Sequence, residues 1–396
     1  MWITQSSIPT NLNTYVSQLK NKKHLIKGYQ AHIENQDVTF SLDNGQNIDN
    51  YNINENVNEG NEVYKFRWNP AKHNIICCGK NVSPRPSFPR DMFNTYKKQM
   101  FKDREDYTVN EQFCSYIDLV LESETLPAFK SNIKNVPAVS GENKLPPQQV
   151  DFLEELFVAV LTLYKRKIQL THSEAVFNKF LVEPFLQAVS NLINEDECAW
   201  LDAGFFPGEE HLLSMTKQLK QNGQFKDARF CPKADGVIRL QSLSDIEVCV
   251  AEISDVYKNT DMTKINLDHH KGMFGVVSML KTIADEMEYA SLDVFQKIKM
   301  IREDVLTIKP EFKDKEEFLK QAIPFYWSFK CQLEKLMKAI KDLQESHEKN
   351  LKQARNSALP PPLVSKLVSS SIIRLTEKEY CKGTASFVPF YSSEHG

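Results

Sequence analysis

Two acidic residues stand near the two ends of the stretch from Lys233 to Ser254, KADGVIRLQSLSDIEVCVAEIS. Asp235 precedes a first short apolar segment, and Glu252 follows a second one. The residues QSLSD between the segments are too few for a crossover connection, so we expect an antiparallel hairpin. A hairpin folds the start of its first strand beside the end of its second strand. Both carboxylates are therefore expected at the same end of the hairpin.

Paired carboxylates supply the oxygen ligands that a hard divalent cation such as Mg²⁺ or Mn²⁺ prefers. A cation held in this way can activate a bound water molecule and stabilise charge on a phosphate. Alternation along the second segment places Glu252 on the same face as Val248 and Val250, which is unusual for an acid that faces solvent. The alternative interpretation is that Asp235 and Glu252 are solvated or ion-paired at strand ends.

Glu174 is a third candidate metal ligand, because it lies at the start of a helix that precedes the hairpin. The same residue has a structural interpretation. The sequence from Thr171 to Glu174, THSE, matches a capping box, in which the glutamate accepts a hydrogen bond from the amide of the first residue. The two roles are compatible.

Three lysines follow the second acidic residue, and each of them can either assist at the site or be solvated: Lys258, Lys264 and Lys271. His269 and His270 are neighbours on a predicted helix, where adjacent side chains point about 100° apart. At most one of these two histidines can therefore face the site.

The elements that must position these residues are mostly helices. Apolar residues at helical spacing predict helices at about 110–123, 152–168, 171–193, 212–219, 268–287 and 325–351, the third being kinked or split at Pro184. With the hairpin, this order predicts a mixed α/β fold. We predict five parts: a poorly defined N-terminal region with Asn-rich loops (1–130), a linker rich in Pro, Gly and Asn (131–149), a core (150–300), a helical extension (301–362) and a tail (363–396).

Composition narrows the class of protein. The 396 residues carry a net charge of −3, so the whole chain has no general electrostatic attraction for nucleic acid, and a nucleic-acid partner requires a local basic patch such as Lys165–Lys167. No apolar run approaches the roughly 20 residues that span a bilayer, and no signal peptide is recognisable, so we expect no membrane association. The eight cysteines show no zinc-binding spacing. Together these features favour an intracellular protein, nuclear or cytoplasmic.

Two stretches resemble the PD-(D/E)XK nuclease superfamily, and more specifically a large group of fungal proteins that share its nuclease-like core. They are SEAVFNKFLVEPFL, which begins at Ser173, and KADGVI followed by VAEIS and HHKGMFGVVSMLKTIAD. The resemblance implies a central mixed sheet flanked by helices, with additional helices on the C-terminal side. It also implies that Glu174, Asp235 and Glu252 bind Mg²⁺ or Mn²⁺ for the hydrolysis of phosphodiesters in DNA or RNA.

The sequence departs from the superfamily pattern at Ser254, where the motif has a lysine that helps to position the attacking water. A serine cannot supply its positive charge, so Lys271 or Lys258 would have to replace it from another direction. The alternative is a catalytically inactive module with a nuclease fold that binds nucleic acid or a protein partner. A third possibility is an interaction protein that works through its last long helix.

Overall fold

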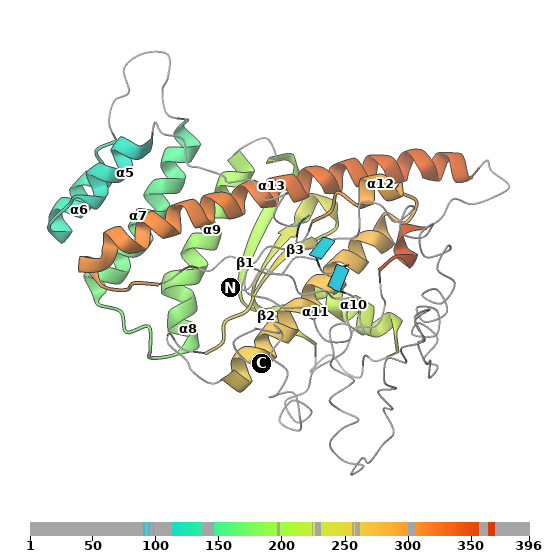
Figure 1. The fold of residues 1–396 in the computed structure, drawn as a ribbon, viewed down its shortest axis with the longest axis horizontal. Helices are drawn as coiled ribbons and strands as arrows, with labels where there is room; N and C mark the ends of the chain where they lie inside the picture. Colours follow the sequence, from blue (N-terminus) through green and yellow to red (C-terminus); the bar gives the residue numbers. More distant parts are fainter. Residues whose placement is uncertain are drawn as a thin grey trace, which may run out of the picture.

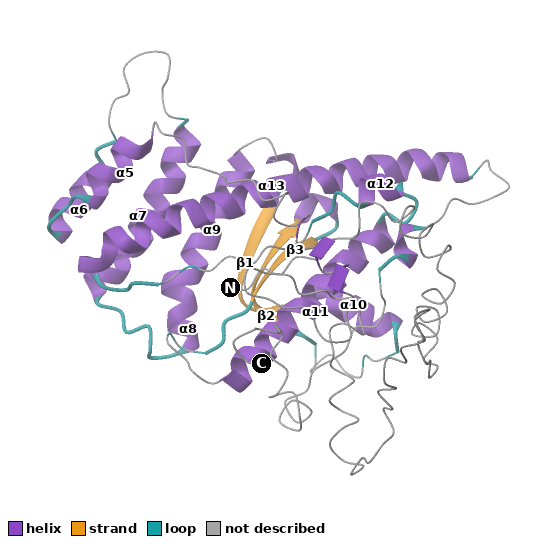
Figure 2. Cartoon of the chain, viewed as in Figure 1, coloured by secondary structure: helices purple, strands orange, loops and turns teal. Residues whose placement is uncertain are grey.

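The computed structural model describes residues 113–136, 146–195, 199–223, 231–255, 262–299, 308–355 and 363–368, together with isolated positions such as Tyr257. Most of the predicted N-terminal region and of the predicted tail lies outside these residues. The described chain is a mostly helical α/β fold, in which a small antiparallel sheet is flanked by helices (Figure 2). The predicted α/β class is therefore confirmed.

Three helices form the N-terminal part of the described chain: α5 (Cys114–Leu121), α6 (Leu126–Ile133) and α7 (Pro147–Arg166). Helix α6 begins after Thr125, whose hydroxyl oxygen accepts a hydrogen bond from the amide of Ala128 at 3.3 Å. Edge-to-face contacts between aromatic rings, such as that of Phe129 with Phe157, join these helices. Both ends of the predicted linker, 131–149, are thus helical, and its middle lies outside the described residues.

The helical segment that carries Glu174 changes from an α-helix to a π-helical turn before Pro184. It consists of α8 (Glu174–Phe177), a π-helical turn (Asn178–Val182) and α9 (Glu183–Glu195). Proline has no amide hydrogen and its ring crowds the preceding turn, so the regular α-helical hydrogen bonding cannot continue through it. The wider π turn accommodates this break. The expected kink or split at Pro184 therefore takes the form of a π turn just before it, and the helical segment continues through Pro184.

The sheet contains three strands in the order β1–β2–β3: β1 (Ala203–His211), β2 (Lys233–Leu240) and β3 (Ile246–Ala251). Both pairings are antiparallel, and Gly236 of β2 lies opposite Ala251 of β3. The predicted hairpin is therefore present, and its turn contains Ser244 and Asp245 in the left-handed conformation. The expected mixed sheet is wrong for the described chain, because none of its three strands pairs in parallel. Strand β1 was not predicted.

Helices pack against both outer strands of the sheet, β1 and β3. Helix α9 packs against β1, and α11 (Met262–Glu286) packs against β3 with α10 (Leu213–Gln221) beside it (Figure 1). All six residues of β3 are buried, and all of them except Glu247 are apolar. The end of the hairpin that carries the two acids therefore lies beside α11.

The longest helix, α13 (Lys315–Ala354), runs across α9 (Figure 1). Its side chains from Phe318 to Leu343 join the same hydrophobic core as Phe185 of α9, so the predicted helical extension shares its core with the sheet. The remaining short elements are α12 (Leu292–Phe295) and 3₁₀ turns at Ala199–Leu201, Gln241–Leu243, Phe312–Asp314 and Val364–Lys366. No described helix combines the length and apolar character needed to cross a bilayer.

Candidate functional site

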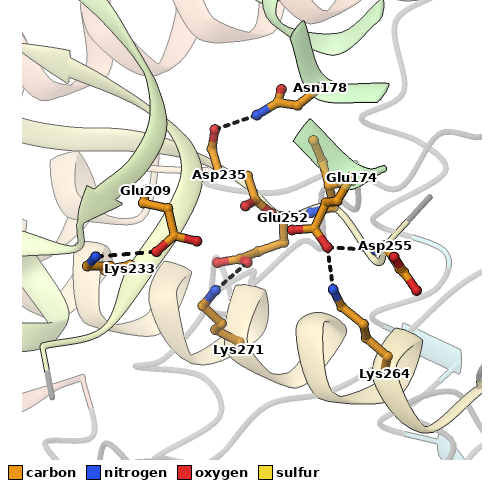
Figure 3. Close-up of polar contacts among 10 residues, drawn as sticks. Glu174, Asn178, Glu209, Lys233, Asp235, Glu252, Asp255, Lys264 and Lys271 are labelled. Carbon is orange, nitrogen blue, oxygen red and sulfur yellow. Dashed lines mark hydrogen bonds and ion pairs between the residues drawn. The ribbon is translucent and has the colours of Figure 1, made fainter. Parts of the chain in front are cut away.

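Asp235 and Glu252 lie side by side at one end of the β2–β3 hairpin (Figure 3). The pairing of Gly236 with Ala251 places the residues just beyond that pair next to each other. A carboxylate oxygen of Asp235, Oδ2, accepts a hydrogen bond from the backbone amide of Ile253 at 2.6 Å. This bond fixes the carboxylate of Asp235 against the chain that follows β3. Burial raises the pKa of Asp235, while the bond to Ile253 opposes that shift.

Glu252 is the most deeply buried acid of this group, with 5% of its surface exposed. One of its oxygens, Oε2, accepts a hydrogen bond from the ammonium group of Lys271 at 2.6 Å. The other, Oε1, is buried and has no hydrogen-bond partner among the described residues. Burial raises the pKa of Glu252 to about 8, and the nearby carboxylates of Asp235 and Asp268 add to the shift, whereas Lys271 opposes it.

Lys271 comes from α11 and points at the hairpin end (Figure 3). Burial disfavours its positive charge, but the carboxylates of Glu252, Asp235 and Asp268 together outweigh that effect and raise the pKa of Lys271 above its ordinary value. The ammonium group is therefore charged at neutral pH. Of the two lysines predicted to assist the site, Lys271 lies in it, whereas Lys258 lies outside the described residues.

Glu174 begins α8, but it does not form the predicted capping box. The residue that caps the helix is Ser173, whose hydroxyl oxygen accepts a hydrogen bond from the amide of Val176 at 3.2 Å. The carboxylate oxygen Oε2 of Glu174 instead accepts a hydrogen bond from the amide of Asp255 at 3.1 Å and forms an ion pair with Lys264. Glu174 thus belongs to the same group of charged residues as the hairpin acids (Figure 3).

Two hydrogen bonds hold α8 and the π turn against the hairpin. Asp255 adopts a left-handed conformation, with φ of 71°, at the turn where its amide meets Glu174. Asn178, in the π turn, donates a hydrogen bond from its side-chain amide to the backbone oxygen of Asp235 at 3.0 Å. The π turn before Pro184 thus positions a polar contact to β2, the strand that carries Asp235.

Helix α11 contributes one polar face to the site. Lys264, Asp268 and Lys271 are spaced by four and three residues, and this spacing places them on the same side of a helix. Lys264 contacts Glu174, and Lys271 contacts Glu252. Asp268 was not among the predicted site residues, although the spacing of these three charges offered a signal for it.

Asp268 is 7% exposed, and its carboxylate lies beside the side chain of Ser254, the residue at the motif-lysine position. Its second oxygen, Oδ2, is buried and has no hydrogen-bond partner in the described part of the chain. Burial raises the pKa of Asp268 to about 6, against the opposing effects of Lys271 and Lys264.

A divalent cation fits the chemistry of the two hairpin acids better than that of Glu174. Mg²⁺ usually keeps several waters and binds proteins through one or two carboxylates. Asp235 and Glu252 offer two adjacent carboxylates, one of which has a buried oxygen without a donor. Glu174 is already engaged by Lys264 and a backbone amide. Within the described ranges, no three acidic, histidine or cysteine side chains are arranged to hold a metal ion together.

Neither the protein-family models, nor the curated proteins, nor the solved structures that were compared with this chain match it. The interpretation of the site therefore rests on its geometry and chemistry.

Proposed function

We propose that the protein is a metal-dependent phosphodiesterase that acts on nucleic acid through a PD-(D/E)XK-like core. The observation that carries this proposal is the position of Lys271. Its ammonium group lies 2.6 Å from Glu252 and comes from a helix, whereas the superfamily motif would supply a lysine from residue 254. The order of α8, the β2–β3 hairpin and α11, with an acid on α8 and two at the hairpin end, supports the same assignment.

In this proposal Asp235 and Glu252 would hold Mg²⁺ or Mn²⁺, and the cation would supply activation of water and neutralisation of charge on the phosphate. The amide of Ile253 orients Asp235. Lys271 carries the positive charge that Ser254 lacks, and it stabilises the negative charge that develops on the phosphate. A direct bond from Glu174 to the cation stays a prediction, as does a role for Lys258.

Nuclease assays on DNA and RNA with Mg²⁺ or Mn²⁺ test the proposal. We expect Asp235→Asn to lower the cleavage rate at least about 100-fold, since it removes one of two cation ligands. The matched control is Asp285→Asn on α11, because Asp285 is bonded to Lys281 and Gln218. Cleavage that survives in Asp235→Asn would contradict the metal site.

A second candidate function is a catalytically inactive module of the same fold that binds nucleic acid or a protein partner. The internal ion pairs favour it, because Glu174 and Glu252 each have a lysine partner and do not require a metal for neutralisation. Exposed Lys165, Arg166 and Lys167 at the end of α7 provide a local positive surface for a phosphate backbone.

Calorimetric titration with Mg²⁺ separates the two candidates. Binding that is lost in Asp235→Asn supports the enzyme, whereas the absence of binding at millimolar Mg²⁺ supports the inactive module. In the second case, changing Lys165, Arg166 and Lys167 to glutamine should weaken the binding of nucleic acid and make that binding less sensitive to salt.

A further inference from the structure

Asp268 is a buried acid for which the proposed reaction has no role so far. It is 7% exposed, and its oxygen Oδ2 has no hydrogen-bond partner among the described residues, although two ammonium groups lie on the same face of α11. Leaving a buried carboxylate oxygen unpaired is unfavourable. Oxygen Oδ2 of Asp268 can therefore accept a hydrogen bond from a donor that reaches it after a change in the site, such as the binding of a cation.

Lys271 is a donor on the same face of α11, one helical turn after Asp268. Side chains three residues apart on a helix are neighbours, and a lysine has a flexible stem of four carbons. Lys271 bonds with Glu252, while the carboxylate of Asp268 lies beside Ser254. The ammonium group of Lys271 therefore has two carboxylates within its reach, and it occupies one of them.

A divalent cation changes the balance between these two carboxylates. A cation held by Asp235 and Glu252 repels the ammonium group from the oxygen that it now contacts. Lys264, whose charge also acts on Asp268, is held by an ion pair with Glu174 on α8. Asp268 remains as the buried acceptor for the displaced group.

We propose that Asp268 is a positioning residue that receives the ammonium group of Lys271 when a divalent cation takes over the carboxylate of Glu252. This inference rests on the proposed function. Because Asp268 lies against Ser254, the move brings the ammonium group next to the residue at which the superfamily motif has its lysine. The positive charge then stays beside the cation and remains available to the phosphate.

Acylation of lysines by an N-hydroxysuccinimide ester, read by mass spectrometry, tests the inference without relying on activity. In the unchanged protein, we expect saturating Mg²⁺ to alter the acylation rate of Lys271 less than about twofold, because the ammonium group passes from one carboxylate to another. In Asp268→Asn, Mg²⁺ should raise that rate at least about fivefold, because the displaced group has no second carboxylate.

Two variants control the experiment. Asp268→Glu keeps a carboxylate and should keep Lys271 protected, and Asp285→Asn, which changes a paired acid on the same helix, should behave like the unchanged protein. Calorimetry on the same samples measures Mg²⁺ binding. If Mg²⁺ binds and the acylation of Lys271 in Asp268→Asn does not rise, the inference is overturned while the proposed function stands. If Mg²⁺ does not bind the unchanged protein, both are overturned.

Discussion

Two buried glutamates lie near the two ends of β3: Glu247 is the second residue of the strand, and Glu252 follows its last residue. Their surroundings differ. Glu247 of β3 accepts hydrogen bonds from the amides of Leu213 and Ser214, each at 2.8 Å, one on each carboxylate oxygen. These amides begin α10, whose preceding residue, Leu212, has no side chain that can cap a helix. Arg239 adds an ion pair with Glu247 at 3.5 Å.

Glu252, five residues further on, has a single lysine as its hydrogen-bond partner, and its second oxygen is unsatisfied among the described residues. It also lies close enough to Asp235 and Asp268 for their charges to raise its pKa. The comparison separates two uses of a buried acid. Glu247 stabilises the start of a helix, whereas the surroundings of Glu252 favour a further cation or a proton.

The largest effect on stability is expected for Glu247. We expect Glu247→Gln to lower the free energy of unfolding by about 3–5 kcal/mol, because an amide nitrogen would face the amides of α10 and Arg239 would lose a buried partner. Urea denaturation measures the change. Equal losses in Glu247→Gln and Glu252→Gln would remove the distinction between the two residues.

The pH dependence of the unfolding free energy provides a second test of the difference between Glu252 and Glu247. Glu252 has a folded-state pKa of about 8, raised from 4.5, so the folded state holds its proton more tightly than the unfolded state. The folding free energy therefore becomes less favourable as pH rises from about 4.5 to about 8. In a metal-free buffer, Glu252→Gln should remove part of this loss, on the order of 1–2 kcal/mol between pH 6 and pH 8. Denaturation midpoints at the two pH values measure it, and an unchanged slope would contradict the raised pKa.

Removing the lysine beside Glu252 should affect metal binding more than folding. We expect Lys271→Met to tighten Mn²⁺ binding about tenfold, because the ammonium group no longer competes for the carboxylate, and to lower cleavage. Calorimetry and the nuclease assay measure the two effects. Lys281→Met, on the same helix and paired with Asp285, is the matched control. Weaker Mn²⁺ binding in Lys271→Met would show that the ammonium group supports the cation instead of competing with it.

The smallest effect is expected for the ion pair of Glu174 with Lys264, whose side chains are 30% and 35% exposed. Lys264→Met should change the free energy of unfolding by less than about 1 kcal/mol, because solvent screens the pair. Thermal or urea denaturation measures the change. A loss of several kcal/mol would mean that this pair, like Glu247, is part of the structural framework.

The local pattern of the sequence was sufficient to predict the hairpin and most of the helices around it. Two apolar segments with a five-residue polar turn leave the chain few alternatives to an antiparallel pair, and β2 and β3 fall where they were predicted. Helical spacing likewise identified α7, α9, α11 and α13, although α11 and α13 begin earlier than predicted.

Strand β1 could not be recognised in the same way. Its sequence, AGFFPGEEH, contains a proline, two glycines and three polar residues, which is typical of a loop. Pairing with β2 is what makes it a strand, and an irregularity between Pro207 and Glu210 absorbs the residues that do not fit. Residues distant in the sequence therefore determined this element.

The site shows the same division. The sequence by itself determined that Asp235 and Glu252 lie together, because a short hairpin turn acts locally. Only the tertiary structure decided the partners of the other charges: Glu174 meets Lys264 across 90 positions of the chain, and Asp268 meets Ser254. Such contacts depend on how α8 and α11 pack against the hairpin, and no local pattern encodes that packing.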